Sequence, residues 1–334
     1  MREPGEVRPE PSSPRRIAAA FTGLLLFLLA ACTTAPPPSS VAAFGAALGA
    51  TTSSYRAGLS AAQSVETSAN RAVLMAKATC RDARCPPITS LTPKAPILSE
   101  DLLALQFAVL EGLEAYADLL ASLTDAQTQT LVSQSVAGIG KSLQGLAGDI
   151  GTVTGKQLPG LDAATIQRGT TALGALGDFL VAEKLNAELP RIIEQNHPRI
   201  VAIADFLAAT IGTAAPGKDK SGAVVPAHGL RAILAAQLEQ IDVNAVVEIE
   251  RLRRDARVGS IELAAFVGKA YDDNAARAQQ TDAALAEIQA ALRKLVTAHA
   301  ALRAPSDPST WQQIQSFIGF AQRARDAAER ALGK

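Results

Sequence analysis

Apolar residues that recur at alternating steps of three and four positions restrict the fold of this chain more than any other feature. The strictest example, near the C-terminus, is Leu285, Ile288, Leu292, Leu295, His299 and Leu302. Residues three and four apart lie on one face of a helix, so this spacing predicts a helix with an apolar stripe of the coiled-coil kind. A looser version of the pattern covers residues 227–303 without a proline. If that segment is continuous, it predicts a helix of roughly 110 Å, with Gly259 and Gly268 as its weak points.

Earlier segments repeat the helical pattern over residues 41–80, 99–150 and 162–212, and a final amphipathic helix follows Asp307 and Pro308. Aromatic residues make up only 4% of the chain, and abundant alanine favours helices over sheets. The sequence therefore predicts an all-α fold, an elongated bundle of about five helices in one domain over residues 41–334. The long helix of residues 227–303 is the largest element of that prediction.

Several residues mark the ends of these helices. We expect Ser99, Asp162 and Asp307 to cap helix N-termini, and the helix after Asp162 to run toward Gly212. Pro190 and Pro198 lie within the third periodic segment and are expected to kink or split it. That segment ends in IVAIADFLAATI, residues 200–211. A helix that is apolar nearly all round is either central in a core or inserted in lipid, and its short length favours the core.

The N-terminus carries a second, shorter apolar run. Arg15 and Arg16 precede residues 17–31, which contain no charge. A membrane-spanning helix needs about 20 apolar residues, so this run suits the apolar region of a signal peptide better. It ends in Leu29-Ala30-Ala31-Cys32. An ordinary cleaved signal with an unmodified cysteine and an uncleaved membrane helix are the alternatives.

This tetrapeptide resembles the lipobox of bacterial lipoproteins: a branched apolar residue, two small residues and a cysteine. The resemblance implies that the Cys32 thiol is lipidated, that the chain is cleaved after Ala31 and that the new N-terminus is acylated, with palmitate among the acyl groups. Several acyl chains anchor a protein where a single chain would not. Residues 1–31 would then be a signal peptide, residues 32–40 a lipidated cysteine with a Pro/Ser linker, and residues 41–334 a periplasmic helical domain. Thr33, in place of an aspartate, favours the outer membrane over the inner one.

Two further cysteines, Cys80 and Cys85, lie in the segment CRDARC. Outside the cytoplasm thiols are oxidised, so the pair is expected to form a disulfide that closes a small loop. A catalytic dithiol is the weaker interpretation, because such pairs are usually spaced C-x-x-C. Metal binding is weaker still, since no histidine or further cysteine lies nearby.

Charge and motifs narrow the classes of function. The chain has 32 basic and 32 acidic residues, and removal of residues 1–31 leaves 28 and 29. No basic stripe indicates a nucleic-acid partner. His197, His228 and His299 are the only histidines, and none has the spacing of a metal site. No catalytic residue, metal ligand or cofactor-binding motif is predicted, and the basic run at residues 251–257 is interpreted as a salt-bridged helix face.

These features favour a non-enzymatic binding or scaffolding module, anchored to a bacterial membrane and facing the periplasm. Its partners would be membrane lipid, through the acyl anchor, and an envelope protein or a second copy of the chain. The alternative is a membrane-active protein that inserts the Gly-rich residues 138–151 or the apolar residues 200–211 into a bilayer. An enzyme would require that the fold gather distant carboxylates in one cleft. Oligomeric state and the specific partner stay open.

Overall fold

A computed structural model describes residues 40–78, 98, 100–122, 140, 162–182, 189–218, 221–254, 260–304 and 307–333. The chain divides into two units, Met1–Pro38 and Ser39–Lys334, and every described residue belongs to the second. The predicted lipidation site Cys32, the Pro/Ser linker up to residue 39 and the predicted Cys80–Cys85 disulfide lie outside the described residues. So does most of the Gly-rich segment 138–151.

The described part of the chain is helical apart from one small hairpin, which confirms the all-α prediction. Its helices are α2 (Ser40–Ala78), α3 (Glu100–Ser122), α5 (Ala163–Ala182), α6 (Leu189–Ile211), α7 (Gly229–Arg254), α8 (Ser260–Ala301) and α9 (Pro308–Ala331). Strands β1 (Gly217–Lys218) and β2 (Val224–Val225) pair antiparallel, with Gly217 opposite Val225. Sequence patterns predict only a loop in this place. The helices are thus more numerous than the five expected.

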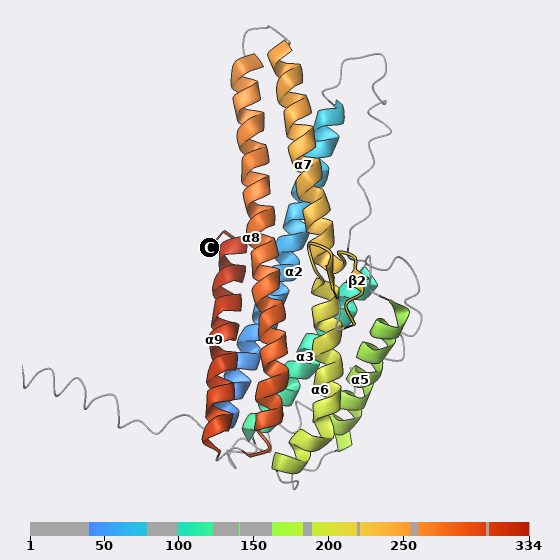
Figure 1. Cartoon of the computed structure of the whole chain (residues 1–334), viewed down its shortest axis with the longest axis vertical. Coiled ribbons are helices and arrows are strands. Elements are labelled where there is room, and N and C mark those ends of the chain that lie inside the picture. The colour runs from blue at the N-terminus through green and yellow to red at the C-terminus, as the bar shows by residue number, and fades with distance from the viewer. Residues whose placement is uncertain are drawn as a thin grey trace, which may run out of the picture. The chain divides into compact units, whose positions relative to one another are not determined.

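The helices pack around α2 and α8, which contact most of the others (Figure 1). One continuous core joins them, and α5 covers α6 on one flank. Contacts follow the length of α2 in order. The Phe44 ring lies 5.6 Å from that of Phe317, Ala61 packs with Ala284 and Ala327, and Ala69 packs with Ile241 and Tyr271. The start of α2 and the part of the α7–α8 pair around Ile241 and Tyr271 therefore lie at opposite ends of the bundle.

Residues 227–303, whose continuity as one helix the sequence leaves open, form two helices. These two helices, α7 and α8, lie side by side and antiparallel (Figure 1). Ile249 contacts the position of Gly268, and the earlier Ile241 packs with the later Tyr271. The strictly spaced stripe of residues 285–302 is buried in the core of the same chain: Leu285, Ile288, Leu292, Leu295, His299 and Leu302. The stripe is thus covered within the described unit, and a coiled coil is not confirmed.

Local signals at the helix ends agree well with the structure. The Thr165 backbone N–H donates to Asp162 Oδ1 at 2.7 Å, and Asp307 caps α9 through the Ser309 N–H at 2.8 Å. The periodic segment 162–212 is split as expected, into α5 and α6, with Pro198 inside α6. Residues 200–211 take the predicted core position, since Ile203 and Phe206 are buried. None of the described helices is long and apolar enough to cross a membrane.

Two glycines allow the end of α6 to cross the start of α7 at backbone contact. Gly212 and Gly229 have φ angles of +68° and +71°. A Cβ at position 212 would lie 2.0 Å from the carbonyl oxygen of His228. An isolated antiparallel bridge between Thr213 and His228 follows directly. This junction, with the β1–β2 hairpin that extends from it, sets the direction in which α7 leaves α6.

Candidate functional site

Three polar side chains form a hydrogen-bonded chain inside the bundle. They come from three helices: Tyr116 from α3, His197 from α6 and His299 from α8. Tyr116 Oη lies 2.8 Å from His299 Nε2, and His299 Nδ1 lies 3.1 Å from His197 Nδ1. Tyr116 and His299 are completely buried, whereas His197 is partly exposed. The chain therefore leads from the core to the surface.

The two imidazoles meet edge to edge. Their planes differ by only 8° and their centroids are 5.4 Å apart. The centroids are thus farther apart than the two Nδ1 atoms by about one ring diameter, so the rings lie nearly in one plane with the nitrogens pointing at each other. One Nδ1 must carry a hydrogen and the other must be bare for this contact to be a hydrogen bond. The geometry fits a neutral pair.

The surroundings keep both histidines neutral. Burial lowers the pKa of His299 to about 3, and the positive charges of His197 and Arg303 add to the effect. The pKa of His197 is lowered by desolvation and by Arg303. Burial likewise raises the pKa of Tyr116. A general base must be within reach of its substrate. His299 is not, because it is buried and the centroid of the Phe44 ring lies 6.0 Å from that of its imidazole. The arrangement suits a role in holding the three helices together.

Sequence reasoning found these residues only in part. His299 was expected as a partly buried residue on the apolar stripe, and it is fully buried. Its contact with His197, 102 positions away, has no sequence signal. His228 lies elsewhere, beside Thr213 at the α6–α7 junction. Within the part of the chain that the structure describes, no group of three His, Cys, Asp or Glu residues could hold a metal ion.

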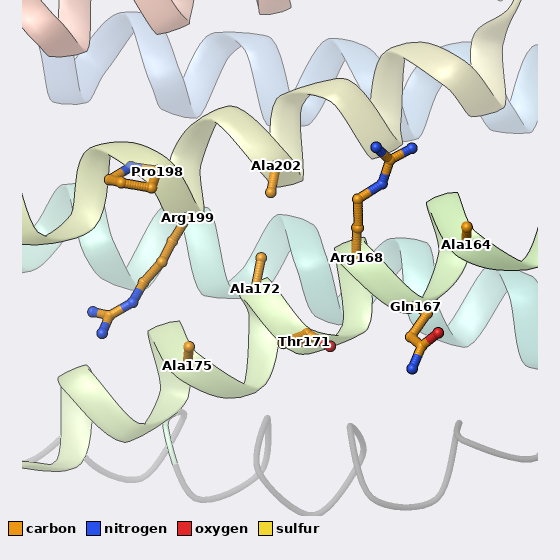
Figure 2. Close-up of a pocket in the computed structure, with 9 residues that line it drawn as sticks. All are labelled: Ala164, Gln167, Arg168, Thr171, Ala172, Ala175, Pro198, Arg199 and Ala202. Carbon is orange, nitrogen blue, oxygen red and sulfur yellow. The ribbon is translucent and has the colours of Figure 1, made fainter.

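A groove lies between α5 and α6 (Figure 2). One of its lining residues, Pro198, directly follows His197 in the sequence. The groove has a volume of about 470 Å³, and alanine side chains of both helices line it. Arg168 of α5 and Arg199 of α6 are its charged lining residues. Arg199 also lies over the Phe179 ring, 5.8 Å from the ring centroid. No sequence motif marks this groove, because its residues are brought together only when the two helices pack.

The α7–α8 pair carries five exposed apolar side chains, which we call together the hairpin surface. Its residues are Val243, Val246 and Val247 on α7 and Ile261 and Phe266 on α8, which are 59%, 61%, 63%, 78% and 69% exposed. They lie beyond the end of α9, whose last residue, Ala331, packs at the level of Ala284 (Figure 1). Among the described helices, α9 thus ends before it reaches this part of the pair.

Charged side chains near the hairpin surface pair with one another. Arg251 binds Glu248 at 2.6 Å and Arg254 binds Glu250 at 2.7 Å. For these two arginines, the predicted salt-bridged helix face is confirmed. Residues 255–259 lie outside the described part. The pairing leaves the apolar side chains, rather than the basic run, as the distinctive feature of this region.

Comparison with protein-family models, with curated proteins and with solved structures found no match to this chain.

Proposed function

We propose that this chain is a lipid-anchored protein of the bacterial envelope that acts as a non-enzymatic helical binding module. The hairpin surface carries this proposal. The lipobox-like residues 29–32 supply the anchor, and a protein of the envelope or a second copy of the chain is the partner. The buried Tyr116–His299–His197 chain serves the scaffold by holding α3, α6 and α8 in register.

The three valines on α7 support a binding role. Val243, Val246 and Val247 are spaced so that they share one helix face. Valine is a poorer helix former than alanine, glutamate or lysine, because its branched side chain loses rotamer freedom. At exposed positions no burial offsets that cost within the described unit. Contiguous exposed apolar groups mark interaction sites more often than isolated ones do.

The position of the hairpin surface fits presentation to a partner. Cys32 precedes Ser40 by eight residues, and an extended chain of that length spans at most about 28 Å. The first residue of α2 would therefore stay near the lipid. From His299, beside the start of α2, to Ile261, α8 covers about 57 Å. The hairpin surface thus lies at the far end of the helical unit from the first residue of α2.

A photo-crosslinking residue at Val246 is expected to trap the partner in intact cells. The matched control is the same residue at Gln322, an exposed position on α9. We expect a discrete product from position 246 alone, and its mass distinguishes a second copy from another protein. Serine at Val243 and Val247 should remove the product. Equal products from positions 246 and 322, or none from either, would contradict the proposal.

The anchor has its own test. Cys32→Ser should abolish labelling with palmitate, because the thiol is the site of lipid attachment, while Cys80→Ser should keep the label. Incorporation of labelled palmitate, followed by denaturing electrophoresis, measures both. A Cys32→Ser chain that is still labelled would disprove the lipobox interpretation without touching the hairpin surface. Of the two segments that the membrane-active alternative would insert, residues 200–211 pack within the core, and most of residues 138–151 lie outside the described part.

A further inference from the structure

The groove between α5 and α6 has an apolar floor that runs along both helices. Ala164, Ala172 and Ala175 of α5 and Ala202 of α6 line it. The two helices approach closely, because a Cβ at Gly169 would lie 2.6 Å from the Phe206 ring. Small residues therefore shape a shallow channel. Its volume of about 470 Å³ lies within the range of small-molecule sites, which are often found between the helices of bundles.

The groove is lined by two guanidinium groups, each of which its own helix holds in place. Arg168 Nη2 donates to Thr165 Oγ1 at 3.0 Å, and Arg199 Nη1 donates to Asn196 Oδ1 at 2.6 Å. In both cases the acceptor lies three residues before the arginine. Figure 2 shows Arg168 extending from α5 toward α6, and Arg199 extending from α6 toward α5. Ala172, Ala175 and Ala202 lie between them, and Ala164 lies beyond Arg168.

Neither arginine forms an ion pair with a carboxylate among the described residues. Hydrogen bonds from Thr165 lower the pKa of Asp162. The positive charge of Arg168 also lowers it, to a smaller extent. The Arg199 guanidinium lies over the aromatic ring of Phe179. Guanidinium groups bind carboxylate and phosphate through paired N–H donors. Both arginines thus offer donors to an anion.

We propose that this groove binds an elongated molecule with an apolar middle and an anionic group at each end. Arg168 and Phe179, the ring that Arg199 covers, are eleven residues apart on α5, which corresponds to about 16 Å. An aliphatic chain of about 12 to 14 carbons covers that length. Such a ligand would place its methylenes on the alanine floor and one anion at each arginine. This site is independent of the hairpin surface and of the lipid anchor.

Tetradecanedioate is the probe, titrated calorimetrically into the full chain in lipid nanodiscs, with empty nanodiscs subtracted. We expect saturable binding that weakens at high salt, and at least tenfold weaker binding of hexanedioate, which is too short to reach both arginines. Arg168→Ala and Arg199→Ala should each lower the affinity for tetradecanedioate about fivefold, as loss of one charged hydrogen-bonded contact does. Arg191→Ala, an exposed arginine of α6 that does not line the groove, is the matched control.

A second variant tests the floor. Ala175→Phe should fill the groove and abolish binding while the far-ultraviolet circular dichroism stays unchanged. Absence of saturable binding would overturn the proposal. So would equal affinities for the two dicarboxylates, equal losses in the Arg191 and Arg168 variants, or binding that survives Ala175→Phe in a folded chain.

Discussion

Gly212→Ala is expected to lower the free energy of unfolding by about 3 kcal/mol or more, the range of severe single substitutions. Two effects add. The backbone at position 212 has a φ of +68°, where a Cβ costs about 1–2 kcal/mol. The added carbon would also lie 2.0 Å from the carbonyl oxygen of His228 and 2.5 Å from its carbonyl carbon. Both atoms belong to backbone and cannot rotate away, so α6 and α7 would have to separate.

Gly222→Ala separates the two effects. Gly222 has a φ of +85° and no neighbouring atom within 4 Å of a built Cβ. Its substitution should cost only the conformational part, about 1–2 kcal/mol. Urea unfolding, followed by circular dichroism, gives both free energies. Similar losses in the two variants would show that the backbone contact at Gly212 contributes nothing beyond its φ angle.

The same junction matters for the proposed function. Gln289 of α8 donates from Nε2 to the carbonyl oxygens of Ala208 and Gly212, at 3.0 Å and 3.2 Å. The Ala208 carbonyl oxygen also accepts the Gly212 N–H at 2.9 Å, so Gln289 links the last turn of α6 to α8. The crossing at Gly212 and Gly229 then directs α7 along α8. A change at this junction therefore displaces the hairpin surface, although none of its residues is altered.

Local features of this fold follow from sequence, and contacts between distant segments do not. Asp162 and Asp307 cap the helices that they precede, because a cap depends only on residues two or three positions away. The helix after Asp162 was expected to run toward Gly212, and α6 ends at Ile211. The contact of Gly212 with His228 depends on the path of the β1–β2 hairpin, which residues 213–226 do not reveal.

The antiparallel packing of α7 on α8 shows a different limit. A spacing of three and four residues has the same appearance whether one helix continues or two helices follow each other. No proline lies in residues 227–303, and only Gly259 and Gly268 mark weak points, so the sequence leaves open whether the segment is one rod. Buried and exposed apolar positions are also hard to separate by periodicity: Val243 and Val247 are exposed, whereas Ile241, only two residues before Val243, is buried.

The histidine pair is beyond any sequence argument of this kind. His197 precedes a proline in α6, and His299 belongs to an apolar stripe of α8. Each is consistent with an ordinary partly buried polar residue. Only the packing of α6 on α8 brings their Nδ1 atoms to 3.1 Å. Burial of His299, together with the contact with His197, makes the stability of the fold depend on pH in the acid range.

Acidification is expected to destabilise the fold through His299. An imidazole in the unfolded chain has a pKa near 6.5, whereas burial, His197 and Arg303 lower the folded pKa of His299 to about 3. Between these values the unfolded chain binds more protons than the folded one. The stability that His299 contributes is therefore fully present above about pH 6.5 and is lost as the pH falls toward 3. Each unit of pKa difference corresponds to about 1.4 kcal/mol.

His299→Gln isolates this effect from the titration of carboxylates, which begins below about pH 5. Urea unfolding is measured between about pH 7 and pH 5 for the unsubstituted chain, for His299→Gln and for His228→Gln. The unsubstituted chain and the His228 variant should lose similar stability over this range. The His299 variant should be less stable at the start and lose less. An unchanged slope in His299→Gln would contradict the assignment.

The geometry also predicts how many protons His197 and His299 together accept before the contact between them breaks. A first proton on His197 leaves its Nδ1–H to donate to His299 Nδ1, and His299 can then donate from Nε2 to Tyr116 Oη. Every hydrogen bond of the chain survives. A second proton would place two N–H groups against each other at 3.1 Å, beside the charge of Arg303 and with no carboxylate among the groups that shift either pKa. Imidazole proton resonances should therefore show one titration that leaves the Tyr116 contact intact, and a second that coincides with loss of the native fold.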